Sequence, residues 1–195
     1  MGQVVVWWEQ WRGRAGVSPA VVRNPKEWRA GRPPYGCEYM TESPEEDLVI
    51  YRRRMPHWRL PGSVYFVTWR LTFFQPELTP GERAVIMSAL QHFDDNKYEL
   101  YASVVMDNHV HALLRPLDKY RLQDIIHSWK SFTAHKFQKE CSREVPIWQE
   151  DYFDRIVRDE KEFLDKAQYI LNNPLKRWPE VENYPWVWVK QNLNP

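Results

Sequence analysis

Two histidines separated by one residue, His109 and His111, are the side chains in this sequence best spaced to do chemistry together. Side chains alternate across a β-strand, so both imidazoles would project from one face while Val110 and Ala112 project from the other. Two imidazoles that converge on one point can bind a divalent metal ion. Such pairs also occur as surface residues or as hydrogen-bonded core histidines, and the pair alone leaves these alternatives open.

A tyrosine near the end of the chain is the second candidate. Residues 160–174 carry apolar side chains at helical spacing, namely Phe163, Ala167, Ile170 and Leu171. Tyr169 and Asn173 are one helical turn apart and lie off this apolar stripe. Because the stripe does not need it, Tyr169 is a candidate for chemistry. The alternative is a half-buried tyrosine at a sheet edge, with Asn-Asn-Pro as a helix-ending signal.

The pattern of apolar residues predicts elements in the order β-α-β-β-α-β-α. They are strands at 62–72, 99–106 and 109–116, helices at 79–93, 121–139 and 160–174, and a strand or extended segment at 146–159. This order is typical of an α+β, ferredoxin-like split βαβ fold, in which helices pack on an antiparallel sheet. The expected fold joins the strand that carries the histidines and the helix that carries Tyr169 in one domain.

Local signals support the boundaries of these elements. Thr79 as N-cap, Pro80 at the first helical position and Glu82 form a capping box. Asp107 and Asn108 are turn residues that predict a hairpin between the two middle strands. Pro174 is expected to end the last helix.

Length and composition indicate one main domain. The chain has 195 residues, 43% of them hydrophobic, which suffices for one sizeable core. We expect an irregular extension at 1–50, the domain at 51–190 and a tail at 191–195. The two cysteines form no spacing pattern, which favours a protein of the cytoplasm. The sequence has no apolar run of about 18 residues, so we expect no membrane segment.

The net charge of +1 argues against indiscriminate binding to polyanions, but basic residues are unevenly distributed. We expect local contacts to a DNA backbone from Arg52, Arg53, Arg54, Arg59, Lys130 and Lys136. The alternative is that these side chains are only solvated. His127 and His135 are two helical turns apart, too far for one ion, and are at most phosphate contacts.

Three segments together resemble a known family: the strand "HVH", the segment "WQEDYFDRIVRDEKEF" and the helix "YILNNPLKRW". They resemble the REP-associated tyrosine transposases of the HUH endonuclease superfamily, in which two histidines flank one bulky apolar residue. The resemblance runs from about residue 51 to about residue 188. Residues 1–50 have no counterpart in it.

The resemblance implies a role for each motif residue. His109 and His111 would bind a divalent cation, Mg²⁺ or Mn²⁺, and Tyr169 on the third helix would be the catalytic nucleophile. Asn173 would complete the metal site, at a position where some relatives have glutamine. The implied reaction is cleavage and rejoining of single-stranded DNA through a covalent 5′-phosphotyrosine, with REP-type hairpins as the substrate.

Several alternatives stay open at this point. The protein could be a domesticated hairpin-binding factor that no longer cleaves, or a small metal-dependent hydrolase that does not act on DNA. Tyr120 and Tyr152 are rival nucleophiles, but neither has a potential metal ligand at a suitable spacing. The resemblance implies a bacterial cytoplasmic protein, and we expect a monomer, with a dimer as the alternative.

Overall fold

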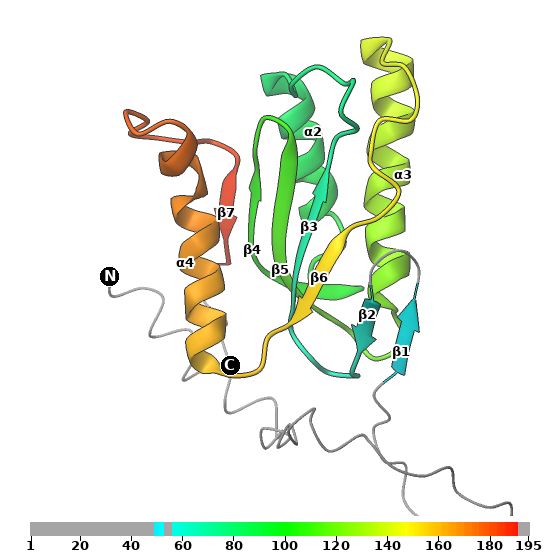
Figure 1. The fold of residues 1–195 in the computed structure, drawn as a ribbon, viewed down its shortest axis with the longest axis vertical. Helices are drawn as coiled ribbons and strands as arrows, with labels where there is room; N and C mark the ends of the chain where they lie inside the picture. The colour runs from blue at the N-terminus through cyan, green and yellow to red at the C-terminus, as the bar shows by residue number, and fades with distance from the viewer. Residues whose placement is uncertain (1–48, 53–55, 191–195) are drawn as a thin grey trace, which may run out of the picture.

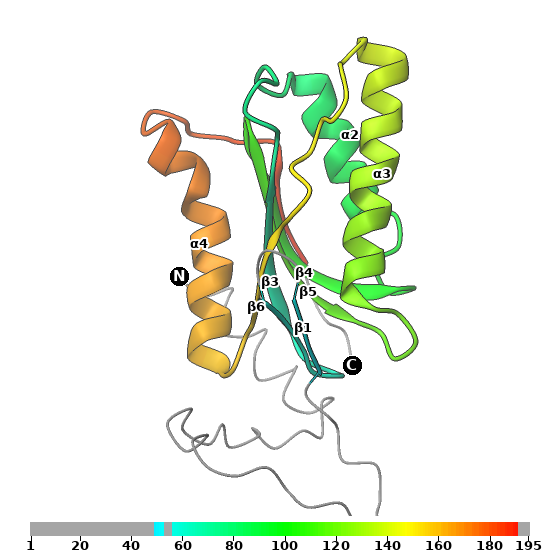
Figure 2. The ribbon, with the colours of Figure 1, turned by 45° about the vertical axis from the view of Figure 1, so that its right-hand side comes forward.

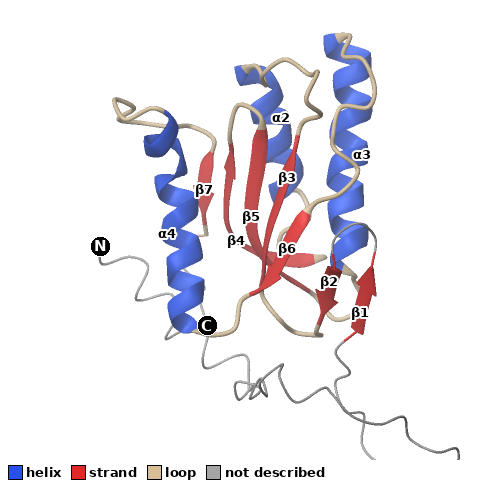
Figure 3. Ribbon diagram, viewed as in Figure 1, coloured by secondary structure: helices blue, strands red, loops and turns tan. Residues whose placement is uncertain are grey.

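A computed structural model of the chain describes residues 49–52 and 56–190, and a central sheet with helices on both sides organises them (Figure 1, Figure 3). The strands are β1 (Val49–Arg52), β2 (Pro56–Arg59), β3 (Tyr65–Arg70), β4 (Tyr98–Val105), β5 (His109–Pro116), β6 (Phe153–Ile156) and β7 (Val187–Val189). The helices are α2 (Pro80–Gln91), α3 (Leu122–Cys141) and α4 (Glu160–Arg177).

The main sheet has the strand order β6-β3-β5-β4-β7, and all neighbouring strands are antiparallel. β3 and β4 therefore run in the same direction with β5 between them, which is the predicted split βαβ arrangement. The α+β, ferredoxin-like prediction is confirmed. The register places Thr68 of β3 opposite His111 of β5, and Arg70 opposite His109.

The sheet separates two apolar cores. Helices α2 and α3 cover one face and α4 covers the other (Figure 2). Val110, Ala112 and Leu114 of β5 belong to the core beneath α2 and α3. Leu113 packs on the opposite side with side chains of α4, including Phe163. The alternation within β5 thus directs its odd-numbered side chains, the histidines among them, towards α4.

The predicted capping box at the start of α2 is confirmed, and α4 begins with a side-chain cap as well. Thr79 accepts a hydrogen bond from the backbone N–H of Glu82, and the Glu82 carboxylate accepts one from the backbone N–H of Thr79 at 2.8 Å. At α4, the carboxylate of Asp159 accepts a hydrogen bond from the backbone N–H of Glu162 at 2.8 Å. Both caps satisfy N–H groups that have no partner within the helix.

The prediction that Pro174 ends the last helix is wrong, because α4 continues to Arg177. Proline removes one N–H donor from the helix, but Pro174 is buried, and most of the stability of a helix in a protein comes from tertiary packing. The helix ends one turn later, where the N–H of Trp178 donates to the carbonyl of Pro174 at 2.7 Å.

The rest of the described chain adds three short strands to the predicted set. β1 and β2 form a separate hairpin beside β6, and β7 extends the sheet at the β4 edge (Figure 1). The expectation of an irregular extension at 1–50 falls almost entirely outside the described residues, as does the tail at 191–195. No helix among the described residues combines the length and apolarity that a bilayer crossing requires.

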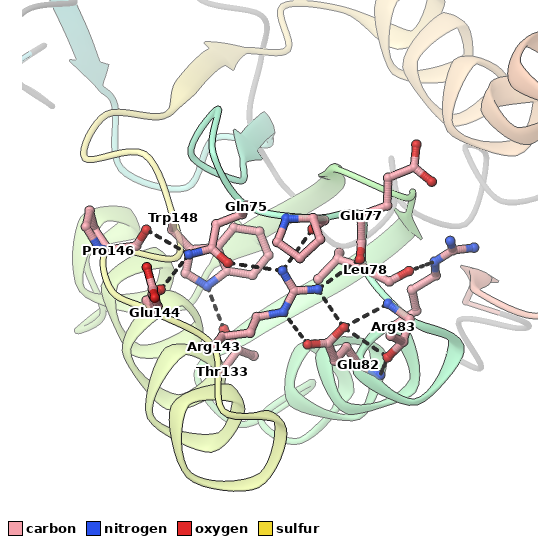
Figure 4. Close-up of polar contacts among 12 residues, drawn as sticks. Gln75, Glu77, Leu78, Glu82, Arg83, Thr133, Arg143, Glu144, Pro146 and Trp148 are labelled. Carbon is pink, nitrogen blue, oxygen red and sulfur yellow. Dashed lines mark hydrogen bonds and ion pairs between the residues drawn. The ribbon is translucent and has the colours of Figure 1, made fainter.

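A buried ion pair joins the segment after α3 to helix α2 (Figure 4). Arg143, which follows α3, donates to both carboxylate oxygens of Glu82 on α2, with 2.8 Å for its Nη2. It also donates to the carbonyls of Pro76 and Glu77 at 2.8 and 2.9 Å. Burial alone would raise the pKa of Glu82, but the hydrogen bonds from Arg143 and Thr79 outweigh it and lower that pKa. This cluster fixes the loop between β3 and α2.

Candidate active site

His109 and His111 lie on the same face of β5, as the alternation predicted. Their ring centroids are 4.7 Å apart, and the rings are tilted edge to face. His111 is buried, and His109 at the start of the strand is half-buried. Two imidazoles thus meet at the end of a central strand, beneath α4.

The neighbouring strand β3 orients the imidazole of His111. The hydroxyl of Thr68 lies 2.7 Å from Nδ1 of His111, directly across the strand pair. Nε2 of the same ring is buried and has no hydrogen-bond partner within the described part of the chain. A buried nitrogen without a partner is costly unless something binds it. A ring held through one nitrogen with the other left open is the arrangement of a metal-binding histidine.

His109 is held from two sides. Its Nδ1 lies 2.6 Å from the side-chain oxygen of Asn108 in the β4–β5 turn. Its imidazole also has a hydrogen bond with the side chain of Asn173 on α4. The amide of Asn173 is therefore next to the histidine pair, at the place that the resemblance to the transposase family implied.

The helix pattern predicted that Asn173 lies off the apolar stripe of α4, but Asn173 is buried. The side chain is only 6% exposed. At about 100° per residue, Asn173 is about 60° from Ile170, so it borders the buried face. Pro174 is buried as well, so the buried side of the helix is wider than the predicted stripe and includes Asn173.

Tyr169 lies beside His111 and is open to solvent. The two ring centroids are 5.2 Å apart, and the Tyr169 ring is 5.9 Å from that of Phe66. The residue is 37% exposed. The phenol is therefore next to the histidine pair and accessible to a macromolecular substrate, and it is not buried among aliphatic side chains.

The electrostatics of the site keep both imidazoles neutral. Burial is the main cause that lowers the pKa of His111 to about 3, and the neighbouring imidazole of His109 and the charges of Arg70, Lys176 and Lys166 act in the same direction. Burial and Arg70 likewise lower the pKa of His109 to about 4, although Asp107 and Asn173 oppose the shift. Neutral imidazoles at physiological pH have a lone pair available for a metal ion.

The donor set fits a divalent cation with open coordination positions. Two imidazole nitrogens and one amide oxygen are close together, and one buried nitrogen lacks a partner. Across residues 49–52 and 56–190, no three His, Cys, Asp or Glu side chains form a metal-binding group. The site therefore differs from a closed four-ligand zinc centre, which leaves no position for a substrate.

The sequence patterns did not identify two lysines and a threonine that lie at the site. The ammonium of Lys176 lies 4.1 Å from the ring centroid of Tyr169, and that of Lys166 lies 5.0 Å from the ring of Phe66. Thr68 could have been found by pairing the strands, because it is the cross-strand neighbour of His111. Lys176 could have been found from its spacing of seven residues from Tyr169, two turns along the same side of the helix.

The predicted DNA contacts lie elsewhere or are engaged within the protein. Arg59 donates to the carboxylate of Asp154 at 2.5 Å and to the hydroxyl of Tyr152 at 2.9 Å. Arg52 ends β1, while Arg53 and Arg54 fall outside the described residues. A DNA contact by these four arginines stays a prediction.

Lys130 and Lys136 are on α3, which covers the sheet face opposite α4 (Figure 2). The ammonium of Lys130 donates to the backbone carbonyls of Gln149 and Glu150 at 2.7 and 2.8 Å. Lys136 pairs with Glu140 at 2.9 Å. The fold does not bring these two lysines to the face that carries Tyr169.

The rival tyrosines are part of the framework. Tyr152 is half-buried, with its ring 4.7 Å from that of His57 and its hydroxyl bonded to Arg59. Tyr120 packs against the core beneath α2 and α3. Of the three tyrosines considered as nucleophiles, Tyr169 is the one with a ring contact to the histidine pair.

Comparison with known proteins places this arrangement in a family. A protein of Haemophilus influenzae, provisionally named a REP-associated tyrosine transposase, is 25% identical over 159 residues, which span 65% of this chain and 88% of that protein. A solved structure of a REP-associated tyrosine transposase bound to a REP hairpin has a TM-score of 0.58 and 21% identity, and the match covers 70% of this chain and 80% of that one. The family model of IS200-like transposases matches residues 66–173, more than half of the chain, from Phe66 to Asn173. The chain therefore belongs to the family of IS200-like transposases.

Proposed function

We propose that this protein is a metal-dependent endonuclease and transferase for single-stranded DNA, and that it cleaves and rejoins REP-type hairpins through a covalent 5′-phosphotyrosine at Tyr169. The observation that carries the proposal is the meeting of the Tyr169 phenol with His111, whose buried Nε2 has no partner among the described residues. The hairpin is proposed as the substrate because the structurally similar transposase is bound to one.

His109, His111 and Asn173 would hold the cation, which we expect to be Mg²⁺ or Mn²⁺. When bound, a divalent cation neutralises charge on the scissile phosphate and aligns it for in-line displacement. Thr68 and Asn108 keep the two imidazoles in place through their hydrogen bonds to Nδ1. The rigid sheet thus presents preorganised ligands, which reduces the cost of ordering them during the reaction.

Tyr169 supplies the nucleophile. Its phenolic oxygen attacks phosphorus, the bond between phosphorus and the 3′ oxygen breaks, and the phenol loses its proton to water while the leaving oxygen gains one. The products are a free 3′-OH and a 5′ end joined to Tyr169. The phosphodiester is conserved in this adduct, so a 3′-OH can attack it to rejoin DNA without a nucleotide cofactor.

Exposed aromatic rings on a fixed loop are suited to binding unpaired bases. Phe73 is 96% and Phe74 is 48% exposed. They directly precede Gln75 and Pro76, to which Arg143 donates hydrogen bonds. By contrast, Trp69, Trp129 and Trp148 are buried in the core. We propose that Phe73 and Phe74 stack on unpaired bases beside the hairpin, because every base has a π-face that an aromatic side chain can contact.

A cleavage assay with two labels tests the function. A REP hairpin with single-stranded flanks is labelled at either end and incubated with the protein and Mn²⁺ or with a chelator. We expect the 3′-end label to move with the protein on a denaturing gel and the 5′-end label to stay on a shorter DNA, only when metal is present. Hairpin binding without cleavage would favour the domesticated factor instead, and turnover without an adduct would favour a hydrolase.

A further inference from the structure

We propose that Lys166 and Lys176 form a phosphate clamp on α4 that holds the DNA backbone on the two sides of the scissile bond. The inference rests on the proposed function and assigns substrate contacts that the family match does not supply. The clamp consists of these two lysines, one before and one after Tyr169 on the same helix.

Both ammonium groups lie over the aromatic rings of the site. Lys176 is 4.1 Å from the ring centroid of Tyr169 and Lys166 is 5.0 Å from that of Phe66. Phe66 is in turn 5.3 Å from His111 and 5.9 Å from Tyr169, centroid to centroid. The two cations therefore border the surface that a phosphate must approach in order to meet Tyr169.

These lysines differ from most other cations on and around α4. Lys161 pairs with Asp165, Arg155 and Arg158 both pair with Glu162, and Arg177 pairs with Asp107 and Glu77. Among the described residues, no carboxylate forms an ion pair with Lys166 or Lys176. Most other cations on and around α4 are thus paired with carboxylates, while the two lysines next to Tyr169 keep their positive charge. This charge is complementary to a phosphate backbone.

The spacing of the clamp suits a chain of nucleotides that runs along the helix past Tyr169. Lys166 and Lys176 are ten positions apart, so their backbones are separated by about 15 Å along the helix axis. Side chains on a helix lean towards its N-terminus, which brings the ammonium of Lys176 back over the Tyr169 ring. Tyr169 lies between the two lysines along this axis, so a DNA strand that runs along the helix with one phosphate at Tyr169 passes one lysine on each side.

The salt dependence of binding tests the clamp. Affinity for the hairpin is measured in a Tyr169→Phe background, in which no cleavage occurs. Each of Lys166→Gln and Lys176→Gln should reduce the slope of log K against log salt by about 0.7, the value for one contact to a single-stranded phosphate. Lys161→Gln is the matched control on the same helix, because that side chain is 88% exposed and already paired with Asp165; its slope should equal that of the parent.

Neutral phosphates then identify which contact is lost. Single methylphosphonates are placed at each phosphate that flanks the scissile bond. We expect one position whose affinity penalty disappears in Lys176→Gln, and another, across the scissile bond, whose penalty disappears in Lys166→Gln. Lys176→Arg keeps the positive charge and should restore the affinity penalty that Lys176→Gln loses. This result would show that the charge matters and that a substitution at position 176 leaves the protein folded.

The clamp and the proposed function fail in different ways. If the unaltered protein never forms an adduct with any REP hairpin, the function is wrong. If it forms the adduct, but both lysine variants keep the parent's salt slope and methylphosphonate pattern, only the clamp is wrong. Penalties that vanish at the same phosphate in both variants would also overturn the clamp.

Discussion

The phenol ring of Tyr169 on α4 and the imidazole ring of His111 on β5 meet within one chain, with their centroids 5.2 Å apart. The ion pair between Arg177 and Asp107 at 2.9 Å ties the end of the same helix to the β4–β5 turn beside the histidines. One chain therefore brings together the proposed nucleophile and all three proposed ligands. No exchange of helices between subunits is needed to assemble the site.

This arrangement predicts that two defective chains cannot rescue each other. Tyr169→Phe lacks the nucleophile and His111→Ala lacks a ligand, and neither should form an adduct. An equimolar mixture should be equally inactive, because each site draws both groups from its own chain. The measurement is adduct formation in the mixture over a range of protein concentrations. Activity that returns on mixing would show that the tyrosine acts in a partner's site.

The buried pair of Glu82 and Arg143 should control stability in acid. The folded-state pKa of Glu82 is lowered from its ordinary value of 4.5. The carboxylate therefore contributes its full stabilisation above that value and loses it as the pH falls through the folded-state pKa. Glu82→Gln should reduce the free energy of unfolding by about 3–5 kcal/mol at neutral pH, since it leaves a buried arginine without its partner.

Urea denaturation at several pH values measures this effect. The difference between Glu82→Gln and the unaltered protein should shrink as the pH falls below 4.5. Glu140→Gln is the control, because its pair with Lys136 lies on the surface of α3 and should be worth less than about 1 kcal/mol. A difference that stays constant from neutral to acid pH would rule out the assigned role of Glu82.

The exposed phenylalanines should report on base stacking. With 2-aminopurine in the single-stranded flank of the hairpin, binding should quench its fluorescence at the position that stacks on Phe73 or Phe74. Phe73→Ala with Phe74→Ala should abolish that quenching and weaken binding, by about 1–3 kcal/mol for each base that stacks. Phe132→Ala is a matched control, because Phe132 is 54% exposed on α3, across the sheet from Tyr169. Unchanged quenching in the double variant would exclude the stacking role.

The fold and the centre of the site could be predicted because local patterns determine them. Strand alternation fixed the shared face of His109 and His111, and the Asp107-Asn108 turn fixed the hairpin that makes β5 a central strand. The capping box at Thr79 set the start of α2. In each case the decisive interactions join residues that are close in sequence or related by strand pairing.

The remaining features depend on partners distant in sequence. Arg59 is of a residue type that often contacts DNA phosphates. In the structure, however, its guanidinium binds Asp154, which lies 95 positions later in the sequence. The sequence does not show which lysines of α4 pair with carboxylates. Only the folded helix shows that Lys161 pairs with Asp165, while Lys166 and Lys176 form no ion pair within the described part of the chain. Likewise, Pro174 is buried inside α4, which continues past it to Arg177, and this burial depends on tertiary packing that the local sequence does not show.

The nucleophile is the central claim, and mass spectrometry of the adduct tests it most directly. The protein is incubated with REP-hairpin DNA and Mn²⁺, digested, and the peptide that carries the 5′-phosphate is sequenced. We predict that the modified residue is Tyr169, that Tyr169→Phe yields no adduct, and that Tyr152→Phe yields as much as the unaltered protein. An adduct on another residue, or one that persists in Tyr169→Phe, would contradict this account.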